Sequence, residues 1–346
     1  MDSDFIERLS NARGTSGDEG EVTSLIREKI SGFVDNIEVD TMGNLIALKG
    51  MEKNGPKVML NAHMDEVGLI ITRVDEKGFL YFKKVGGIDD RVIYGKKVII
   101  GAHKVKGVIG AKAIHLQKKE EVERTVEAKE LFIDIGAESS DEAKRLVTPG
   151  SYATFDTPFE KLNENYFVGK AFDDRLGCSI ASELLEYNYD FPVIALFSSQ
   201  EEIGLRGAAT GTYKYTPDIS ITIEGTISAD IPEVKEYQKC SIIGNGPVIT
   251  IKDRSVITDE KLRKKLVSVA TKNSIPYQFK QVIAGGTDSS RIQLTKDGVR
   301  VLVIAVPVRY IHSPVSLFYR EDYDNTKKLI YEFLKCIKED LHGSTD

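Results

Sequence analysis

Apolar runs that alternate with amphipathic segments constrain the fold of this sequence most strongly. After residue 169, three runs are typical of buried β-strands: PVIALFSS (192–199), ISITIEGT (219–226) and VRVLVIAVPVRY (299–310). Three further segments have helical spacing instead: 174–189, 259–274 and 324–340. In the first of these, Leu176, Ile180, Leu184 and Tyr187 share one face. Strands that alternate with helices predict an α/β fold, in which a mainly parallel sheet lies between two layers of helices.

A change of sequence pattern in the middle of the chain predicts an inserted domain. From about Leu69 to Tyr166 the sequence consists of short β-rich runs separated by glycines and charged turns, and SDEAKRL (140–146) is its one clear helical piece. This pattern favours a small β-rich domain of PDZ-like or barrel type. We therefore expect a main domain of residues 1–67 plus 167–346 and an insert of residues 68–166.

Composition excludes several classes of protein. The net charge of −6 is spread over interspersed acids and bases, which disfavours a nucleic-acid partner. No run approaches the roughly 18 apolar residues of a membrane span, and the N-terminal residues do not form a signal peptide. The three cysteines form no CxxC pair, which disfavours both a disulfide framework and a thiolate metal site. We expect a cytoplasmic protein.

Polar residues follow the predicted strands at the point where each strand ends. They are His63, Asp65 and Glu66; Asp173 and Asp174; Glu201 and Glu202; Glu224; and His312. In open α/β sheets, ligands bind beyond the carboxyl ends of the strands, so we expect these side chains at one rim of the sheet.

Imidazole and carboxylate groups without thiolates are typical of a site for a divalent transition metal such as zinc, cobalt or manganese. Two histidines and several carboxylates exceed the needs of one tetrahedral ion, so two ions that share a carboxylate are expected. One member of the pair Glu201–Glu202 is then free to carry a proton while the other binds an ion.

The motifs in these positions are, in chain order, NAHMDEVG, GKAFDDRLG, SSQEEIGLRGA, ITIEGT, IAGGTDSSR and HSPVS. As an ordered set they resemble the M42 family of metallo-aminopeptidases of the glutamyl, deblocking or leucyl type, whose members are often labelled endoglucanase or cellulase-like. The resemblance implies a phosphorylase/hydrolase-like fold of zinc-peptidase type, with a catalytic main domain. It also implies an insert that mediates dimerisation and assembly, up to a dodecamer.

The resemblance also implies a role for each site residue. His63 and Glu224 are expected at a first metal, and Glu202 and His312 at a second. Three further groups complete the expected site: Asp173 as the bridging carboxylate, Asp65 as the residue that orients the His63 ring, and Glu201 as the general base. Asp174 is expected to be a helix cap or hydrogen-bond acceptor. Gly286, Thr287 and Asp288 resemble a loop on the substrate side.

The implied activity is removal of N-terminal residues from short peptides by a hydroxide that bridges two ions, zinc or cobalt, with Glu201 as the base. One departure from the family is that Glu224 stands where Asp is usual. A metal-binding homologue with impaired catalysis therefore stays open, and so does a glycosidase, although polysaccharide clefts favour aromatic platforms and the chain has no Trp. The sequence alone does not identify the preferred first residue, the metal or the oligomeric state.

The remaining motifs have simpler interpretations. Asp89, Asp90 and Arg91 are typical of a turn with an ion pair, although the family resemblance implies that this region can reach a neighbouring subunit's site. The histidines outside the motifs are expected to have ordinary surface roles; they are His103, His115 and His342.

Overall fold

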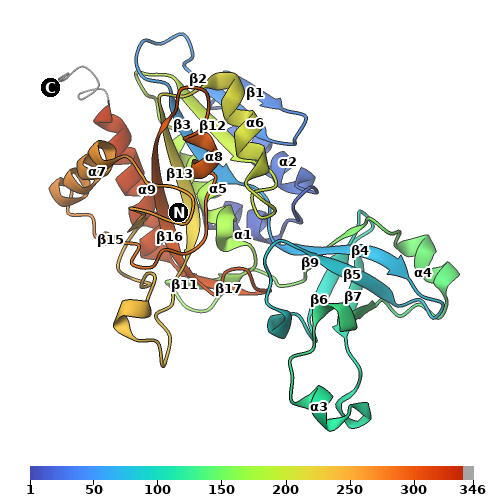
Figure 1. The fold of residues 1–346 in the computed structure, drawn as a ribbon. Coiled ribbons are helices and arrows are strands. Elements are labelled where there is room, and N and C mark those ends of the chain that lie inside the picture. The colour runs from blue at the N-terminus through green and yellow to red at the C-terminus, as the bar shows by residue number, and fades with distance from the viewer. Residues whose placement is uncertain (338–346) are drawn as a thin grey trace.

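The computed structural model describes residues 1–337. Its larger sheet has eleven strands (Figure 1). The central strands are β12 (Val193–Ser198), β3 (Val58–His63), β13 (Ile219–Ile227) and β16 (Arg300–Arg309), which run parallel to one another in this order. The edge strands are β1 (Asn36–Val39), β2 (Leu45–Lys49), β17 (Ser316–Tyr319), β11 (Tyr166–Gly169), β10 (Glu160–Lys161), β14 (Val248–Ile249) and β15 (Gln278–Phe279). The predicted parallel sheet is therefore confirmed at its centre, whereas both edges add antiparallel strands.

Helices cover both faces of this sheet, as predicted. One face packs against α1 (Ser3–Asn11), α2 (Gly20–Ile30), α5 (Phe172–Leu184), α7 (Glu260–Lys272) and α9 (Arg320–Lys335). The other face packs against α6 (Arg206–Tyr215) and the short α8 (Ser289–Ile292). Successive residues of a strand point to opposite faces, so Leu60 lies in the first core and Met59 in the second. The result is a three-layer αβα domain.

The insert is a closed six-stranded barrel, which lies to one side of the large sheet in Figure 1. Its strands, in order around the barrel, are β4 (Gly68–Val74), β5 (Leu80–Val85), β8 (Phe132–Asp134), β7 (Val105–Gly110), β6 (Lys97–Ile100) and β9 (Tyr152–Phe155). The predicted helical piece is α4 (Ser140–Leu146), and a short α3 (Lys119–Val122) lies in the loop between β7 and β8. The barrel strands span residues 68–155, and the division at 68 and 166 stays a proposal.

Two predicted helices have different bounds in the structure. The helix predicted to run to 189 ends at Leu184, and Tyr187 lies beyond it, against Tyr331 with 4.2 Å between the ring centroids. The last helix begins at Arg320 rather than at 324, and its predicted end at 338–340 lies outside the described residues.

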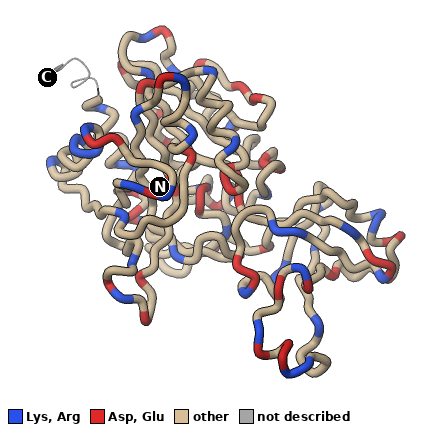
Figure 2. Tube along the Cα trace, in the orientation of Figure 1, with Lys and Arg blue, Asp and Glu red and all other residues tan. Residues whose placement is uncertain are grey.

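Acidic and basic residues are interspersed along the chain (Figure 2). Within the described residues, no helix has both the length and the apolar character needed to cross a membrane.

Candidate metal centre

The carboxyl ends of the central parallel strands bring the predicted polar residues together. His63 is the last residue of β3, and Glu224 lies within β13. Glu201 and Glu202 follow the end of β12 by three and four residues, and Asp173 lies in the first turn of α5. His312, which follows β16 and has a φ of +55°, completes the group.

His63 lies at the buried end of the site, with a side chain that is 2% exposed. Its Nε2 lies 3.3 Å from Oδ1 of Asp173 and 3.6 Å from Oε2 of Glu224. Its Nδ1 lies 3.1 Å from the backbone oxygen of Asp65 and 3.5 Å from Oδ1 of the same residue. The ring is thereby held at one nitrogen while the other nitrogen faces two carboxylates.

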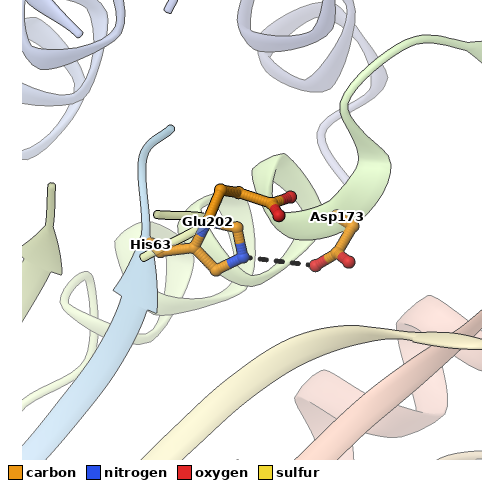
Figure 3. Close-up of side chains that lie close together, drawn as sticks. All are labelled: His63, Asp173 and Glu202. Carbon is orange, nitrogen blue, oxygen red and sulfur yellow. Dashed lines mark hydrogen bonds and ion pairs between the residues drawn. The ribbon is translucent and has the colours of Figure 1, made fainter. Parts of the chain in front are cut away.

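His312 lies at the open end of the site. Its Nε2 lies 3.4 Å from Oδ2 of Asp173 and 3.4 Å from Oε1 of Glu202. The two oxygens of Asp173 therefore face different histidines, Oδ1 toward His63 and Oδ2 toward His312. In Figure 3, Asp173, Glu202 and His63 point toward a common space.

These separations fit ligands that share an ion. Two ligand atoms about 2.0–2.2 Å from a tetrahedral zinc ion lie roughly 3.4 Å from each other. The four separations above lie between 3.3 and 3.6 Å. Within residues 1–337, two groups of three residues have ligand atoms mutually within 4.8 Å: His63, Asp173 and Glu202, and His63, Asp174 and Glu224. Oε1 of Glu224 is also buried and has no hydrogen-bond partner among the described residues. The donor set therefore fits divalent ions.

The crowding of buried acids shifts the pKa values of the site. Burial raises the pKa of Glu202 to about 7, and burial also raises the pKa of Glu201 and of Glu224 well above the ordinary value. Burial opposes the charge on His312, but the carboxylates of Asp173 and Glu202 outweigh it and raise the pKa of His312 to about 9. So many buried carboxylates repel one another, and divalent cations would remove that repulsion.

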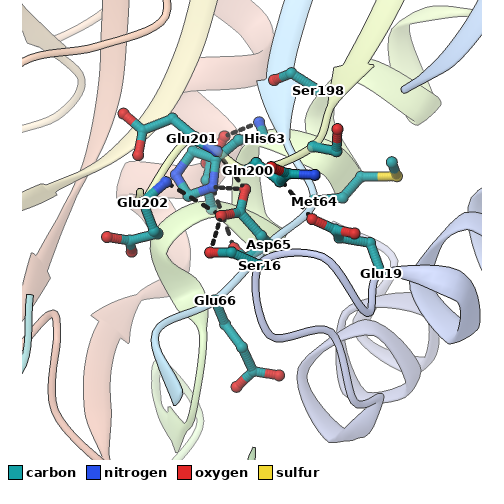
Figure 4. Close-up of polar contacts among 12 residues, drawn as sticks. Ser16, Glu19, His63, Met64, Asp65, Glu66, Ser198, Gln200, Glu201 and Glu202 are labelled. Carbon is teal, nitrogen blue, oxygen red and sulfur yellow. Dashed lines mark hydrogen bonds and ion pairs between the residues drawn. The ribbon is translucent and has the colours of Figure 1, made fainter. Parts of the chain in front are cut away.

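Asp65 holds the backbone of the two glutamates. Its Oδ1 accepts a hydrogen bond from the backbone N–H of Glu201 at 2.9 Å, and its Oδ2 accepts one from Glu202 at 3.1 Å. The hydroxyl of Ser16 donates to Oδ2 at 2.6 Å. Figure 4 shows these contacts, with the Glu201 and Glu202 side chains diverging from the anchored backbone. Asp65 therefore contacts the Glu201–Glu202 turn as well as the His63 ring, and the sequence did not predict its contact with the turn.

Asp174 is fully buried and links α5 to β3. Its Oδ1 accepts from the backbone N–H of Gly177 at 2.9 Å, and its Oδ2 accepts from that of His63 at 3.2 Å. It thus acts as the predicted acceptor near the start of α5. The peptide bond between Asp173 and Asp174 is cis.

The site opens into a cavity of about 520 Å³. Glu201 lines this cavity, and so do Gly286 and Thr287 of the predicted substrate loop. Asp288 is 1% exposed and turns away, because its carboxylate accepts from the Ser198 hydroxyl. This placement differs from the substrate-side position that the resemblance implied for Asp288.

A buried ion-pair network lies behind the site. Glu66, which follows β3, pairs with Lys170 at 2.7 Å and with Arg175 at 3.3 Å. Nε of Arg175 donates to the backbone oxygen of Met64. This network ties the start of α5 to the segment that carries His63, and the strand pattern alone did not reveal it.

The other predicted features lie at the surface. Asp89 forms the expected ion pair with Arg91 in a short 3-10 turn. His103 and His115 are exposed on the barrel domain, as expected, and His342 lies outside the described residues.

Nearly the whole chain is similar to known aminopeptidases. Residues 43–329 match the model of the M42 glutamyl aminopeptidase family. A putative aminopeptidase of Acetivibrio thermocellus is 39% identical over 95% of this chain and 97% of its own length. A lysyl aminopeptidase of Pyrococcus furiosus is 30% identical over 98% of both chains.

Solved structures have the same architecture. A TET aminopeptidase from a marine sediment Thaumarchaeota archaeon has a TM-score of 0.93 at 32% identity, covering 96% of this chain and 95% of its own. The TET1 peptidase of Pyrococcus horikoshii, described as assembling into a tetrahedron or an octahedral shell, has a TM-score of 0.85 at 35% identity, with 96% and 98% covered. A Thermotoga maritima protein described as an endoglucanase has a TM-score of 0.80 at 36% identity, with 96% and 97% covered. These likenesses confirm the predicted fold class.

Proposed function

Because this chain belongs to the M42 family of aminopeptidases, we propose that it is a dinuclear metallo-aminopeptidase that removes N-terminal residues from short peptides. The observation that carries the dinuclear proposal is the position of Asp173, whose two oxygens face two different histidines. A carboxylate in that position can bridge two ions. Family membership makes the chain a peptidase, whereas the residue roles below are inferred from the geometry of the site.

We assign the ligands by their separations. His63 and Glu224 would hold one ion, His312 and Glu202 would hold the other, and Asp173 would bind both. Zinc and cobalt suit this set of imidazole and carboxylate donors. The longer side chain of Glu224, in place of the usual Asp, still brings its Oε2 within 3.6 Å of His63 Nε2, which argues against a site that has lost its first ion.

Glu201 is the proposed general base. Its carboxyl lines the cavity and belongs to neither group of candidate ligands. When bound, the ions would polarise the peptide carbonyl and activate a water molecule. Glu201 would take a proton from the attacking water and pass it to the leaving amine. Burial raises the pKa of Glu201 well above its ordinary value, which favours uptake of that proton. Asp65 would hold the backbone of Glu201 in position through the hydrogen bond from its N–H.

Removal and restoration of metal test the class of reaction. Initial rates on aminoacyl-p-nitroanilides are measured for protein treated with EDTA and then given Zn²⁺ or Co²⁺. We expect hydrolysis to be lost and then restored, with two ions bound per chain by elemental analysis. Hydrolysis that EDTA does not affect would contradict the proposal.

The variant Glu201→Gln tests the base. We expect kcat to fall by about 10²–10⁴-fold with both ions still bound, because general acid–base catalysis contributes about that much. Glu52→Gln, at an exposed residue, is the matched control and should leave kcat unchanged. Full activity of Glu201→Gln would show that Glu201 is not the general base.

The glycosidase alternative rests on the name endoglucanase that the Thermotoga maritima structure carries. A glycosidase needs two carboxylates and no metal, so it leaves His63 and His312 without a function in this site. Release of reducing sugar that resists EDTA would support it. Metal binding without turnover of any peptide would support the impaired homologue, and Glu224→Asp would then be the next variant to test.

For assembly and location we propose a cytoplasmic homo-oligomer in which the barrel domain mediates dimers that build a dodecamer. The assemblies described for TET1 of Pyrococcus horikoshii support the oligomer. The three cysteines are free and at least two are buried, which fits a reducing compartment. Light scattering of the purified protein tests the oligomeric state.

A further inference from the structure

We propose that Glu19 is a positioning residue for catalysis, because its carboxyl group holds the backbone of the Glu201–Glu202 turn. This inference rests on the proposed aminopeptidase function and on the assignment of Glu201 as the general base. Oε1 of Glu19 accepts a hydrogen bond from the backbone N–H of Gln200 at 3.1 Å and another from that of Gly17 at 2.7 Å (Figure 4). Gln200 directly precedes Glu201 in the chain.

Three successive backbone N–H groups of the turn donate to side-chain carboxyl groups. The first, from Gln200, is accepted by Glu19. The next two, from Glu201 and Glu202, are accepted by Asp65. Asp65 therefore holds the two glutamates themselves, and Glu19 holds the residue through which the chain enters the turn from β12.

The side chain of Glu19 does not serve its own helix. Glu19 is the N-cap residue of α2, but its side chain makes no capping hydrogen bond, although accepting one from the first turn is what a polar N-cap side chain usually does. The nearby acids Asp18 and Glu21 pair with Arg13. Glu19, in contrast, is 6% exposed and is directed at Gln200. Contact with the turn therefore explains this buried acid better than helix capping does.

The backbone of Gln200 has a conformation that its surroundings must hold. Its φ is +57°, in the left-handed region that residues other than glycine rarely adopt. Such a conformation persists only where neighbouring groups fix it. The N–H of Gln200 donates to Glu19, and its carbonyl accepts from the N–H of Arg206 at 3.2 Å. Without Glu19 we expect Gln200 to relax toward an ordinary φ, which would move the Glu201 carboxyl away from its working position.

Glu19 and Glu201 line different cavities. Glu201 lines the cavity of the candidate metal centre, whereas Glu19 and Gln200 line a second cavity of about 470 Å³. Among the described residues, none lines both cavities. A substitution of Glu19 therefore leaves the lining of the first cavity unchanged, and its effect on the reaction must pass through the turn. For this reason we expect kcat to change while KM does not.

Steady-state kinetics on the best aminoacyl-p-nitroanilide, with metal-loaded protein, test this inference. Glu19→Ala should lower kcat by roughly tenfold to a hundredfold, the fold-change that corresponds to a backbone N–H that loses its acceptor. KM should stay within about threefold, with both ions still bound, because the lost interaction does not bind substrate. Glu19→Gln retains the acceptor oxygen and should keep kcat within about threefold of the wild type.

Two control variants separate positioning from a general loss of stability. Asp18→Ala changes the next residue of the same second cavity, which pairs with Arg13, and should leave kcat unchanged. Val22→Ala removes two methyl groups from a fully buried residue of α2 and should lower the melting temperature without lowering kcat. If Glu19→Ala loses no more kcat than Val22→Ala does, Glu19 only stabilises the fold and the inference is wrong.

Hydrogen exchange reports on the turn without any turnover. A peptic fragment that covers residues 199–205 should exchange faster in Glu19→Ala than in the wild type, and at the wild-type rate in Glu19→Gln and Asp18→Ala. Unchanged exchange or unchanged kcat in Glu19→Ala overturns the role of Glu19 while leaving the aminopeptidase proposal intact. If the wild type hydrolyses no substrate after metal is restored, the proposed function is wrong and this inference is wrong with it.

Discussion

Replacement of Asp65 by Asn tests whether the carboxylate that holds the Glu201–Glu202 turn is needed for catalysis. The carboxylate accepts three hydrogen bonds, from Glu201 N–H, Glu202 N–H and the Ser16 hydroxyl. An amide group has one oxygen and one NH₂, so Asn can keep the acceptors on one side only. The less costly orientation keeps the contacts of Oδ2 with Ser16 and Glu202 and turns the NH₂ toward Glu201.

The free-energy cost of Asp65→Asn follows from that orientation of the amide. One charge-assisted hydrogen bond is lost, and the N–H of Glu201 is left facing another donor in a buried position, which together cost about 2–4 kcal/mol. If the turn relaxes to escape that contact, the Glu201 carboxyl leaves its working position, and the same energy appears as a fall in kcat/KM of roughly 30- to 1,000-fold. If the turn does not relax, the cost appears in the free energy of unfolding.

Both quantities are measured on one set of variants. Steady-state kinetics on the best p-nitroanilide substrate, with metal content checked, gives kcat/KM, and urea denaturation gives the free energy of unfolding. Ser16→Ala is the matched control, because it removes one neutral donor from the same carboxylate and should cost about 1 kcal/mol. If Asp65→Asn keeps kcat/KM within threefold and unfolds at the wild-type urea concentration, Asp65 does not position the base.

Two further predictions concern stability. A Cβ at Gly177 in α5 would lie 2.4 Å from Oδ1 of Asp174 and 2.6 Å from the backbone oxygen of Ile223, so Gly177→Ala should lower the free energy of unfolding in urea by about 1–3 kcal/mol. Gly20→Ala is the control and should not lower it, because a Cβ at Gly20 would have no atom of residues 1–337 within 4 Å. Equal effects of the two substitutions would contradict the packing argument. Burial raises the pKa of Glu19 to about 7 from 4.5, so the folded state binds the proton more tightly and stability should fall by up to about 3 kcal/mol as pH rises from 4.5 through 7. Glu19→Gln should flatten that decline in EDTA-treated protein, as followed by melting temperature against pH, and an unchanged slope would show that Glu19 does not cause it.

The sequence predicted that these polar residues lie together at one rim of the sheet, because their positions follow from strand direction. His63 is the last residue of β3 and Glu224 lies in the carboxyl-terminal half of β13; the residues before them in both strands are buried, and parallel strands gather their carboxyl ends at one rim. The order of the motifs added the second histidine, His312. The three-layer fold and the barrel followed from the same alternation of strand and helix patterns and from its interruption after residue 68.

What the sequence did not predict depends on contacts between distant segments. The side chain of Asp65 accepts hydrogen bonds from both Ser16 and Glu201, although Glu201 lies 136 positions after Asp65 in the sequence. Asp288 was expected on the substrate side together with Gly286 and Thr287, which line the cavity, yet its side chain is buried and accepts a hydrogen bond from Ser198. Edge strands such as β10, two residues long, leave too short a pattern to recognise.

The loop that leaves the barrel at the end of β5 touches the rim of the site. A Cβ at Gly86, whose φ is +81°, would lie 3.4 Å from Cβ of Glu202, and one at Gly87 would lie 3.6 Å from Nδ1 of His312. The loop after β5 of the barrel is therefore packed against the more exposed half of the site, at Glu202 and His312. If the barrel carries the contacts between subunits, assembly and metal binding are thermodynamically linked. When assembly raises the affinity for an ion at His312, binding of that ion stabilises the assembly by the same free energy.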